Sequence, residues 1–283
     1  MTSFQFLTKP LHPFRSSQMS EKNAMLSTRD PSVIAIIQAR MGSSRLPGKV
    51  LKQIGSKPML FHVVLSARKA QSVGQVVVAT TTDSSDQPVV ELCRDHGFPC
   101  FRGDPLDVLD RYYQTACLFQ AKTIVRITGD CPLMDPREID RTVHAFKETG
   151  VDFAANRLPP PWKRTTPIGM DIEVITFDAL SRAWREAEAK YEREHVMPYL
   201  YDEEGRFSTL LVDHDPDIGH LRLTVDTPED LELVREIFKY SDNSDEISIN
   251  EILNLFREFP ELPQINAGIH HKSFKDVDQK VDK

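Results

Sequence analysis

Three cationic side chains follow directly after a short apolar segment of the chain. Residues 33–37 are all apolar, and Arg40, Arg45 and Lys49 lie in the glycine- and serine-containing loop that comes next. Fixed cations and backbone N–H groups at the end of a buried strand are a typical binding site for a polyphosphate. The loop therefore predicts a phosphate-binding site, and the alternative is a surface turn whose charges are solvated.

This loop does not match the two common phosphate-binding motifs. A P-loop requires Gly, four residues and then Gly-Lys-Ser/Thr. Here five residues separate Gly42 from Gly48, and Val50 stands where the hydroxyl residue is needed. The Gly-x-Gly-x-x-Gly fingerprint of dinucleotide-binding folds is missing from the sequence as well. Neither a P-loop nucleotidase nor a dinucleotide-dependent enzyme is therefore indicated.

Two aspartates stand at the ends of other apolar segments. Asp130 follows the segment 123–128, and Asp226 follows the strand-like segment 221–225. Carboxylates in this position are suited to hold a hard divalent cation through oxygen. An aspartate near a proline can also serve as a turn or helix cap, although Thr227 is the expected cap of the next helix.

A scaffold must bring these loops and carboxylates together. Apolar runs predict strands at 33–37, 76–80 and 123–128, and helical spacing predicts helices at 58–71 and 106–120. This alternation indicates an α/β fold with a Rossmann-like, mostly parallel sheet and helices on both faces. Ligands of such sheets bind at the carboxyl ends of the strands, where the loop and the aspartates are expected.

The segment 37–49, IQARMGSSRLPGK, resembles the opening signature of the sugar-acid cytidylyltransferases. The SpsF-like branch is the most similar, and it is related to the acylneuraminate and 3-deoxy-manno-octulosonate cytidylyltransferases. The resemblance covers about residues 33–240 and includes the segments 126–133 and 224–231. It implies a fold of the nucleotide-diphospho-sugar transferase type. It also implies transfer of CMP from CTP to an acidic sugar, a nonulosonic or related 2-keto acid, with release of pyrophosphate, for surface polysaccharide biosynthesis.

The resemblance also implies roles for individual residues. Arg45, Lys49 and Asp130 would be catalytic, and Asp130 and Asp226 would bind Mg²⁺ as the cofactor. A larger set, drawn mostly from the loop, is expected to contact the nucleotide. Its members are Gln38, Ala39, Arg40, Gly42, Ser43, Arg45, Lys49, Thr81 and Arg126.

The acceptor site is expected to include Arg157, Asp171, Glu173 and His195. Apolar and acidic residues alternate over 171–174, which predicts a strand with one solvent-facing side. A guanidinium such as that of Arg157 suits a substrate carboxylate. His195 is a candidate for proton exchange, and a structural role in a charged helix is its alternative.

Composition restricts the possible partners. The net charge of −7 argues against nucleic-acid binding, which relies on a basic face. The four cysteines lack zinc-type spacing and predict reduced thiols in a cytoplasmic protein. No apolar run approaches the roughly 18 residues of a membrane span. The expected partners are CTP and an acidic sugar, without nucleic acid or membrane span, and the resemblance implies a homodimer.

The two ends of the chain look peripheral. Residues 1–30 carry no sustained periodicity and predict a disordered or mis-started leader, with a targeting segment as the alternative. Residues 31–262 are expected to form the nucleotidyltransferase domain. Residues 263–283, which include His270 and His271, are expected to form a polar C-terminal tail.

Two other functions are considered for this architecture. A glycosyltransferase that uses a nucleotide sugar would carry an Asp-x-Asp motif after a central strand, whereas Asp130 stands alone between Gly129 and Cys131. A non-catalytic nucleotide-binding module would tolerate loss of the loop lysine or of a metal-binding aspartate. Both features are present, so an enzyme is the favoured prediction.

Overall fold

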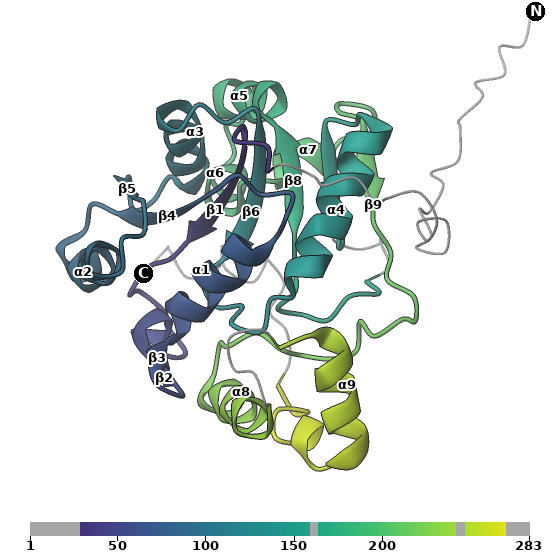
Figure 1. Ribbon diagram of the computed structural model, residues 1–283. Coiled ribbons are helices and arrows are strands. Elements are labelled where there is room, and N and C mark those ends of the chain that lie inside the picture. Colours follow the sequence, from purple (N-terminus) through teal and green to yellow (C-terminus); the bar gives the residue numbers. More distant parts are fainter. Residues whose placement is uncertain (1–28, 159–163, 242–246, 270–283) are drawn as a thin grey trace, which may run out of the picture.

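The computed structural model describes residues 29–158, 164–241 and 247–269 of the chain. Its centre is a seven-stranded sheet in the order β5-β4-β1-β6-β8-β7-β9 (Figure 1). All neighbours in this sheet are parallel except the two pairs that β8 makes. The strands are β1 (Val33–Gln38), β4 (Gln75–Thr81), β5 (Cys100–Gly103), β6 (Thr123–Thr128), β7 (Phe153–Ala155), β8 (Glu173–Thr176) and β9 (Thr209–Leu211), and a separate hairpin pairs β2 (Gln53–Ile54) with β3 (Lys57–Pro58).

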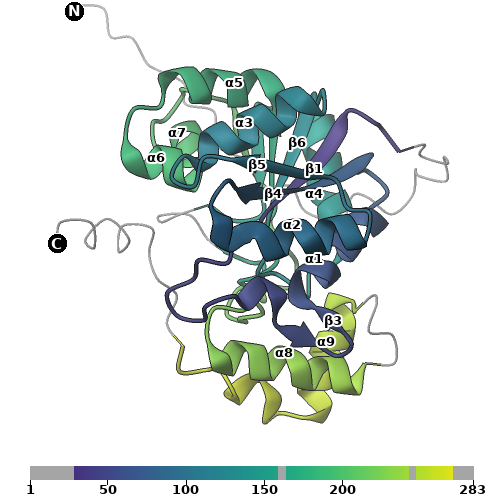
Figure 2. The same ribbon diagram turned by 90° about the vertical axis from the view of Figure 1, so that its left-hand side faces the viewer.

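Helices cover both faces of the sheet, with α3 and α5 on one side and α1 on the other (Figure 2). Two hydrophobic clusters separate these layers, one on each face, and the residues of β1 contribute to both in alternation. The α-helices are α1 (Met59–Lys69), α2 (Gln87–Asp95), α3 (Val108–Leu118), α4 (Pro136–Thr149), α5 (Phe177–Glu186), α6 (Lys190–His195), α7 (Pro198–Tyr201), α8 (Pro228–Tyr240) and α9 (Ile249–Glu258). Short 3-10 helices are η2 (Lys49–Leu51), η3 (Ser84–Asp86) and η4 (Leu262–Gln264).

The expected fold class and its central elements are confirmed. The three predicted strands are β1, β4 and β6, which lie side by side with β1 in the middle. Their apolar runs are continuous because helices cover both faces, so a parallel strand there has no solvent-facing side. The two predicted helices are α1 and α3, each slightly shorter than expected.

The segment 221–225 is not a regular strand. Its β-pairing within the described residues is one isolated bridge, between Arg222 and Ile168. The partner segment around Ile168 is itself irregular, so no ladder can extend from this bridge. The segment nevertheless runs directly into α8, and Thr227 caps that helix as expected, because its hydroxyl accepts the Asp230 N–H at 3.3 Å.

The C-terminal part of the chain packs beside the hairpin at the lower end of Figure 1, where α8 and α9 lie. Arg235 of α8 donates to the Gln53 carbonyl of β2 at 2.9 Å. Packed structure continues past residue 262, since η4 and the buried Asn266 belong to it. The expected leader, apart from residues 29–30, and residues 270–283 of the expected tail lie outside the described residues. No described helix is both long and apolar enough to cross a membrane.

Candidate active site

Lys49 lies at the centre of the candidate site, at the start of η2. Its Nζ atom is 2.6 Å from Asp130 Oδ2 and 2.8 Å from Asp226 Oδ1, and it donates to the Val225 carbonyl at 3.0 Å. Burial alone would lower the pKa of Lys49, but the charges of Asp130 and Asp226 raise it above its ordinary value. Two aspartates that are distant in the sequence therefore meet at one charged ammonium group.

Asp226 is surrounded by cations. Arg45 Nη2 and Arg222 Nη2 each lie 3.0 Å from its Oδ2 atom, while Lys49 contacts Oδ1. Burial raises the pKa of Asp226, but Lys49, Arg45 and Arg222 lower it to a net value of about 2. The carboxylate is therefore ionised at neutral pH.

Backbone contacts explain why Asp130 and Asp226 meet. Asp130 comes just after β6, and its carbonyl accepts the Val225 N–H at 2.9 Å and the Thr224 hydroxyl at 3.2 Å. Gly169 has a φ of +102°, and a Cβ atom there would lie 2.3 Å from the Thr224 nitrogen. Only glycine allows this close approach, so it fixes the path of the chain that leads to Asp226.

One glycine and one buried carboxylate shape the loop after β1. Gly48 has a φ of +66°, and its N–H donates to the Met41 carbonyl at 3.0 Å, which closes the loop before Lys49. Asp86 is 2% exposed and accepts the Met41 N–H at 2.6 Å and the Thr81 N–H at 3.3 Å. Asp86 thus links the segment after β1 to the end of β4. The N–H group of Thr81, an expected nucleotide ligand, is already used in this hydrogen bond.

The other loop residues expected to bind the nucleotide differ in exposure. Arg40 and Gly42 are exposed and Ser43 is half-buried. Ala39 is buried, and its N–H donates to the Ala79 carbonyl at 3.1 Å. The Ala39 N–H is therefore used by the sheet, while the Arg40 side chain is accessible to a ligand.

Arg126 is paired inside the sheet. Its guanidinium donates to the carboxylate of Glu173 on β8, and its Nε donates to Gln38 Oε1 at 3.2 Å. Glu173 is 4% exposed, so the expected solvent-facing side at 171–174 is wrong. The reason is the pairing of β6 with β8, which places Arg126 opposite Glu173 and lets the two buried charges compensate each other. Contacts of either residue with nucleotide or acceptor stay predictions.

Asp171 forms ion pairs with two further guanidinium groups, and it accepts a hydrogen bond from Arg164. Arg164 Nη1 lies 2.7 Å and Arg157 Nε lies 3.7 Å from its Oδ1 atom. Burial alone would lower the pKa of Arg157, but Asp171 and Glu173 raise it. We call Arg126, Arg157, Arg164, Asp171 and Glu173 the arginine cluster. Its three guanidinium groups face two carboxylates, which leaves one net positive charge and suits an anionic ligand.

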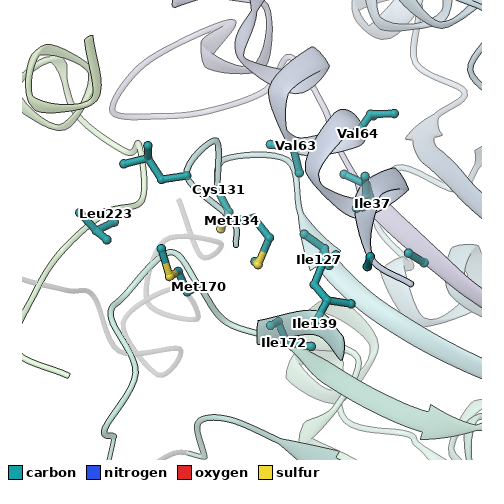
Figure 3. Close-up of a cluster of buried hydrophobic side chains, with 14 of the residues drawn as sticks. Ile37, Val63, Val64, Ile127, Cys131, Met134, Ile139, Met170, Ile172 and Leu223 are labelled. Carbon is teal, nitrogen blue, oxygen red and sulfur yellow. The ribbon is translucent and has the colours of Figure 1, made fainter. Parts of the chain in front are cut away.

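Cys131 directly follows Asp130 in the sequence and belongs to the same hydrophobic cluster as Met170, which directly precedes Asp171. Its thiol is buried, and its pKa is raised by burial and then by the charges of Asp130 and Asp171. Figure 3 shows Cys131 in a hydrophobic cluster with Met170 and Leu223. The two charged groups are therefore neighbours that share an apolar support.

Two helix ends contribute further polar side chains on the α3 side of the sheet. His195 is the half-buried last residue of α6, which packs against α3, and its contact with an acceptor stays a prediction. Tyr201 ends α7 and was not expected at the site. Its pKa is raised by burial and then by the charge of Glu173, while the charge of Arg157 lowers it, so Tyr201 lies within electrostatic range of the arginine cluster.

Several residues of the site were not predicted from the sequence, because no local sequence pattern indicates their role. Asp86 sits in a polar stretch, and Asn266 contacts partners far along the chain. Arg222 contacts Asp226 and Asp230, which are close in the sequence but are separated from it by the irregular backbone before α8. Asp230 lies in the segment 224–231, which carries part of the family resemblance. In the sequence it looks like an ordinary acidic residue in the first turn of a helix. The spacing of Thr227 and Asp230, which matches a capping box at the start of α8, is the sequence signal that could have been used.

The donor set of the aspartate pair fits Mg²⁺. Asp130 Oδ2 and Asp226 Oδ1 both contact the Lys49 ammonium, so their oxygens already converge on one cationic position. Mg²⁺ is commonly bound by one or two carboxylates together with phosphate oxygens and water. No three His, Cys, Asp or Glu side chains form a metal-binding group in the described part of the chain. Nucleotide and water would therefore supply the remaining ligands.

Known proteins resemble this chain in sequence and structure. A family model described as Cytidylyltransferase matches residues 34–258. The spore coat polysaccharide biosynthesis protein SpsF of Bacillus subtilis is 29% identical over 236 residues, which is 81% of this chain and 95% of SpsF. A cytidylyltransferase from Leptospira borgpetersenii serovar Hardjo-bovis is structurally similar, with a TM-score of 0.78 and 32% identity over 85% of this chain and 99% of that chain.

A more distant neighbour shares the fold. It is a CMP:2-keto-3-deoxy-manno-octonic acid synthetase complexed with CTP, with a TM-score of 0.57 and 22% identity over 74% of this chain and 98% of that chain. The family model spans the strands, the loop and both aspartates of the candidate site. The chain therefore belongs to the cytidylyltransferase family and is a nucleotidyltransferase.

Proposed function

We propose that this enzyme transfers CMP from CTP to an acidic sugar, a nonulosonic or related 2-keto acid, for surface polysaccharide biosynthesis. One observation carries the proposal: Lys49 and Arg45 meet Asp130 and Asp226 at the carboxyl ends of the central strands. The similarity to the spore coat polysaccharide protein SpsF and to the 2-keto acid synthetase supports the choice of sugar and of pathway class. A cytoplasmic homodimer stays a prediction, and light scattering tests its dimeric state.

The reaction requires charge compensation more than it requires a nucleophilic side chain. A sugar hydroxyl attacks the α-phosphorus of CTP, the bond to the β-phosphate breaks, and pyrophosphate and one proton are released. Lys49 and Arg45 would bind the phosphates and stabilise the charge that builds up on the leaving pyrophosphate. Gly48 and Asp86 would keep the loop that carries these cations in place.

The aspartate pair would hold Mg²⁺ through Asp130 Oδ2 and Asp226 Oδ1. When bound there, Mg²⁺ would supply Lewis-acid polarisation of the phosphoryl group. The two carboxylates also keep Lys49 charged and oriented, as the raised pKa of its ammonium group indicates. Both roles require ionised aspartates, and the pKa of about 2 for Asp226 meets that requirement.

The arginine cluster would bind the acceptor. Its net positive charge supports binding of an anionic sugar, and the shared hydrophobic cluster of Cys131 and Met170, which flank Asp130 and Asp171 in the sequence, supports a position near the aspartate pair. Arg157 is the preferred ligand for the sugar carboxylate, because its buried Nε has no hydrogen-bond partner among the described residues and its ion pair with Asp171 is long, at 3.7 Å. An acceptor carboxylate would complete the guanidinium contacts.

Pyrophosphate release tests the proposal. The purified protein is incubated with Mg²⁺, each of the four common nucleoside triphosphates in turn, and a panel of 2-keto acid sugars and neutral sugars. Release is expected with CTP and an acidic sugar. Release with no combination, or only with a neutral sugar, would refute the proposed reaction.

The variant Asp130→Asn tests the assignment of the aspartate pair in the same assay. Loss of one charge-stabilising group in an active site typically costs about 100-fold or more in turnover. The fold should persist, because the asparagine can still accept a hydrogen bond from Lys49. A rate close to wild type at saturating Mg²⁺ would remove Asp130 from the site.

A further inference from the structure

Asp226 lies in a loop and needs support from outside it. It belongs to no helix or strand and precedes α8. Lys49 and Arg45, which contact its carboxylate, are assigned above to the nucleotide phosphates. The third cation, Arg222, contacts Asp226 Oδ2 at 3.0 Å and is buried, with 8% exposure. Arg222 is therefore the side chain that can hold Asp226 while CTP is bound.

Arg222 is itself fixed by a fully buried carboxylate. Its Nε and Nη2 atoms donate to Asp230 Oδ1 and Oδ2, both at 2.8 Å, and Asp230 is 0% exposed. Asp230 also accepts the N–H groups of Asp226 at 2.9 Å and Thr227 at 3.1 Å. One carboxylate thus orients both the backbone of Asp226 and the guanidinium that contacts its side chain.

Asn266, from the segment after η4, completes this arrangement. Its Nδ2 donates to Asp230 Oδ1 at 2.9 Å and to the Arg222 carbonyl at 3.1 Å. The side chain is buried, with 5% exposure. The C-terminal end of the described chain therefore reaches, through two hydrogen bonds, the pair that orients Asp226.

We propose that Asp230 and Asn266 are positioning residues that hold Asp226, through Arg222, in the direction required for Mg²⁺ and CTP. This inference rests on the proposed function. A bidentate guanidinium–carboxylate pair is rigid, so Arg222 offers Asp226 a fixed partner rather than a flexible one. The single positive charge of Arg222 faces two carboxylates, those of Asp230 and Asp226. It therefore neutralises Asp226 only in part, and the Asp226 carboxylate can bind a second cation. Outer partners of this kind commonly change metal affinity by about 10- to 100-fold when they are lost.

Binding of Mn²⁺ tests the proposal without relying on turnover. The full chain is saturated with a CTP analogue whose α,β-bridging oxygen is replaced by a methylene group, and Mn²⁺ is titrated by electron paramagnetic resonance. Asn266→Ala should raise the Mn²⁺ dissociation constant by about 10-fold. Asn254→Ala is the matched control. Asn254 is exposed on α9, and among the described residues its side chain accepts a hydrogen bond only from Arg257. It should bind Mn²⁺ as the wild type does.

The variant Asn266→Asp separates hydrogen bonding from space filling. It keeps the shape of the side chain but sets a carboxylate against Asp230, so it should weaken Mn²⁺ binding at least as much as Asn266→Ala. Circular dichroism and thermal midpoints establish that each variant is folded. Folded variants at position 266 with wild-type Mn²⁺ affinity would overturn the positioning role and leave the proposed function intact. A wild-type chain that binds no Mn²⁺ with the analogue would overturn both.

Discussion

Lys49 donates to three acceptors at the site, which matches the three protons of its ammonium group. Arg45 also forms an ion pair with Asp226. Binding of CTP would thus replace one set of ion pairs by another. The affinity for the nucleotide depends on how much better phosphates satisfy Lys49 than the two carboxylates do. A highly charged triphosphate can replace the two carboxylates, because it offers Lys49 more negative charge than they do.

Replacement of Lys49 by methionine should therefore weaken CTP binding. Hydrogen bonds to charged groups contribute about 1.5–3 kcal/mol, so the dissociation constant for CTP with Mg²⁺ should rise about 10- to 100-fold in calorimetry. Lys122→Met, at an exposed position just before β6, serves as the control and should leave it unchanged. If the dissociation constant for CTP were equal in Lys49→Met and the wild type, the loop would be a surface turn with solvated charges and not a phosphate-binding site.

Replacement of Arg157 by glutamine should affect the acceptor and not the nucleotide. Loss of the guanidinium removes one positive charge from the arginine cluster, so KM for the acidic sugar should rise about 10- to 100-fold while KM for CTP stays within about twofold. Steady-state kinetics measure both constants. Arg182→Gln is the control, because Arg182 is a half-exposed residue of α5 paired with Glu186. A change confined to KM for CTP would contradict the assignment.

The sequence predicts residues whose neighbours along the chain reveal them. Lys49 and Asp130 each follow an apolar strand, so their place at the edge of the sheet follows from the fold class. Asp86, Arg222 and Asn266 could not be predicted in this way. Asp86 and Asn266 act through hydrogen bonds to partners far away in the sequence, which composition alone does not encode. Arg222 pairs with the nearby Asp226 and Asp230, but the segment between them has no helical or strand period that would predict these contacts.

At the scale of elements, strands buried on both faces were the most predictable. β1, β4 and β6 are continuous apolar runs because helices cover both sides of them. β8 was harder, because Glu173 looks like a solvent-facing residue until Arg126 of β6 is placed opposite it. The segment 221–225 was harder still, since a single bridge to an irregular partner leaves no periodic signal.

The substitution Gly169→Ala tests how the segment before α8 is held. An added Cβ would lie 2.3 Å from the Thr224 nitrogen, and the φ of +102° is unfavourable for alanine. The free energy of unfolding should fall by about 2–4 kcal/mol, and the Mg²⁺ concentration for half-maximal activity should rise because Asp226 is displaced. Urea denaturation and kinetics provide the two measurements.

A second glycine provides the control for this variant. A Cβ at Gly268 would meet no atom of the described residues within 4 Å, and the φ of Gly268 lies outside the left-handed region. Gly268→Ala should change stability by no more than about 0.5 kcal/mol. Similar behaviour of the two alanine variants would show that the close approach at Gly169 does not support Asp226.

At the scale of the whole molecule, the site is a local concentration of cations on an acidic protein. The chain carries a net charge of −7, yet Arg45, Lys49 and the arginine cluster gather at one edge of the sheet. The loop after β1 and the C-terminal segment that ends near Asn266 approach this edge from opposite ends of the described chain. The fold thus joins its first loop and its last packed segment at Asp226.

A chain that begins at Met25 tests where the functional domain starts. The first strand begins at Val33 and the described contacts of the site begin at Gln38. The shortened protein keeps every residue that the structure describes, so its kcat and KM for CTP should stay within about twofold of the values for the full chain. A loss of about tenfold or more would assign a role in the site to the preceding residues.

The most direct test of the central claim is a crystal structure of the protein with CTP and Mn²⁺, with the ion located by its anomalous scattering. One anomalous peak is expected at about 2 Å from an oxygen of Asp130 and an oxygen of Asp226, with the Lys49 ammonium group moved onto the phosphates. An ion bound elsewhere, with Lys49 still between the two aspartates in the presence of CTP, would contradict it.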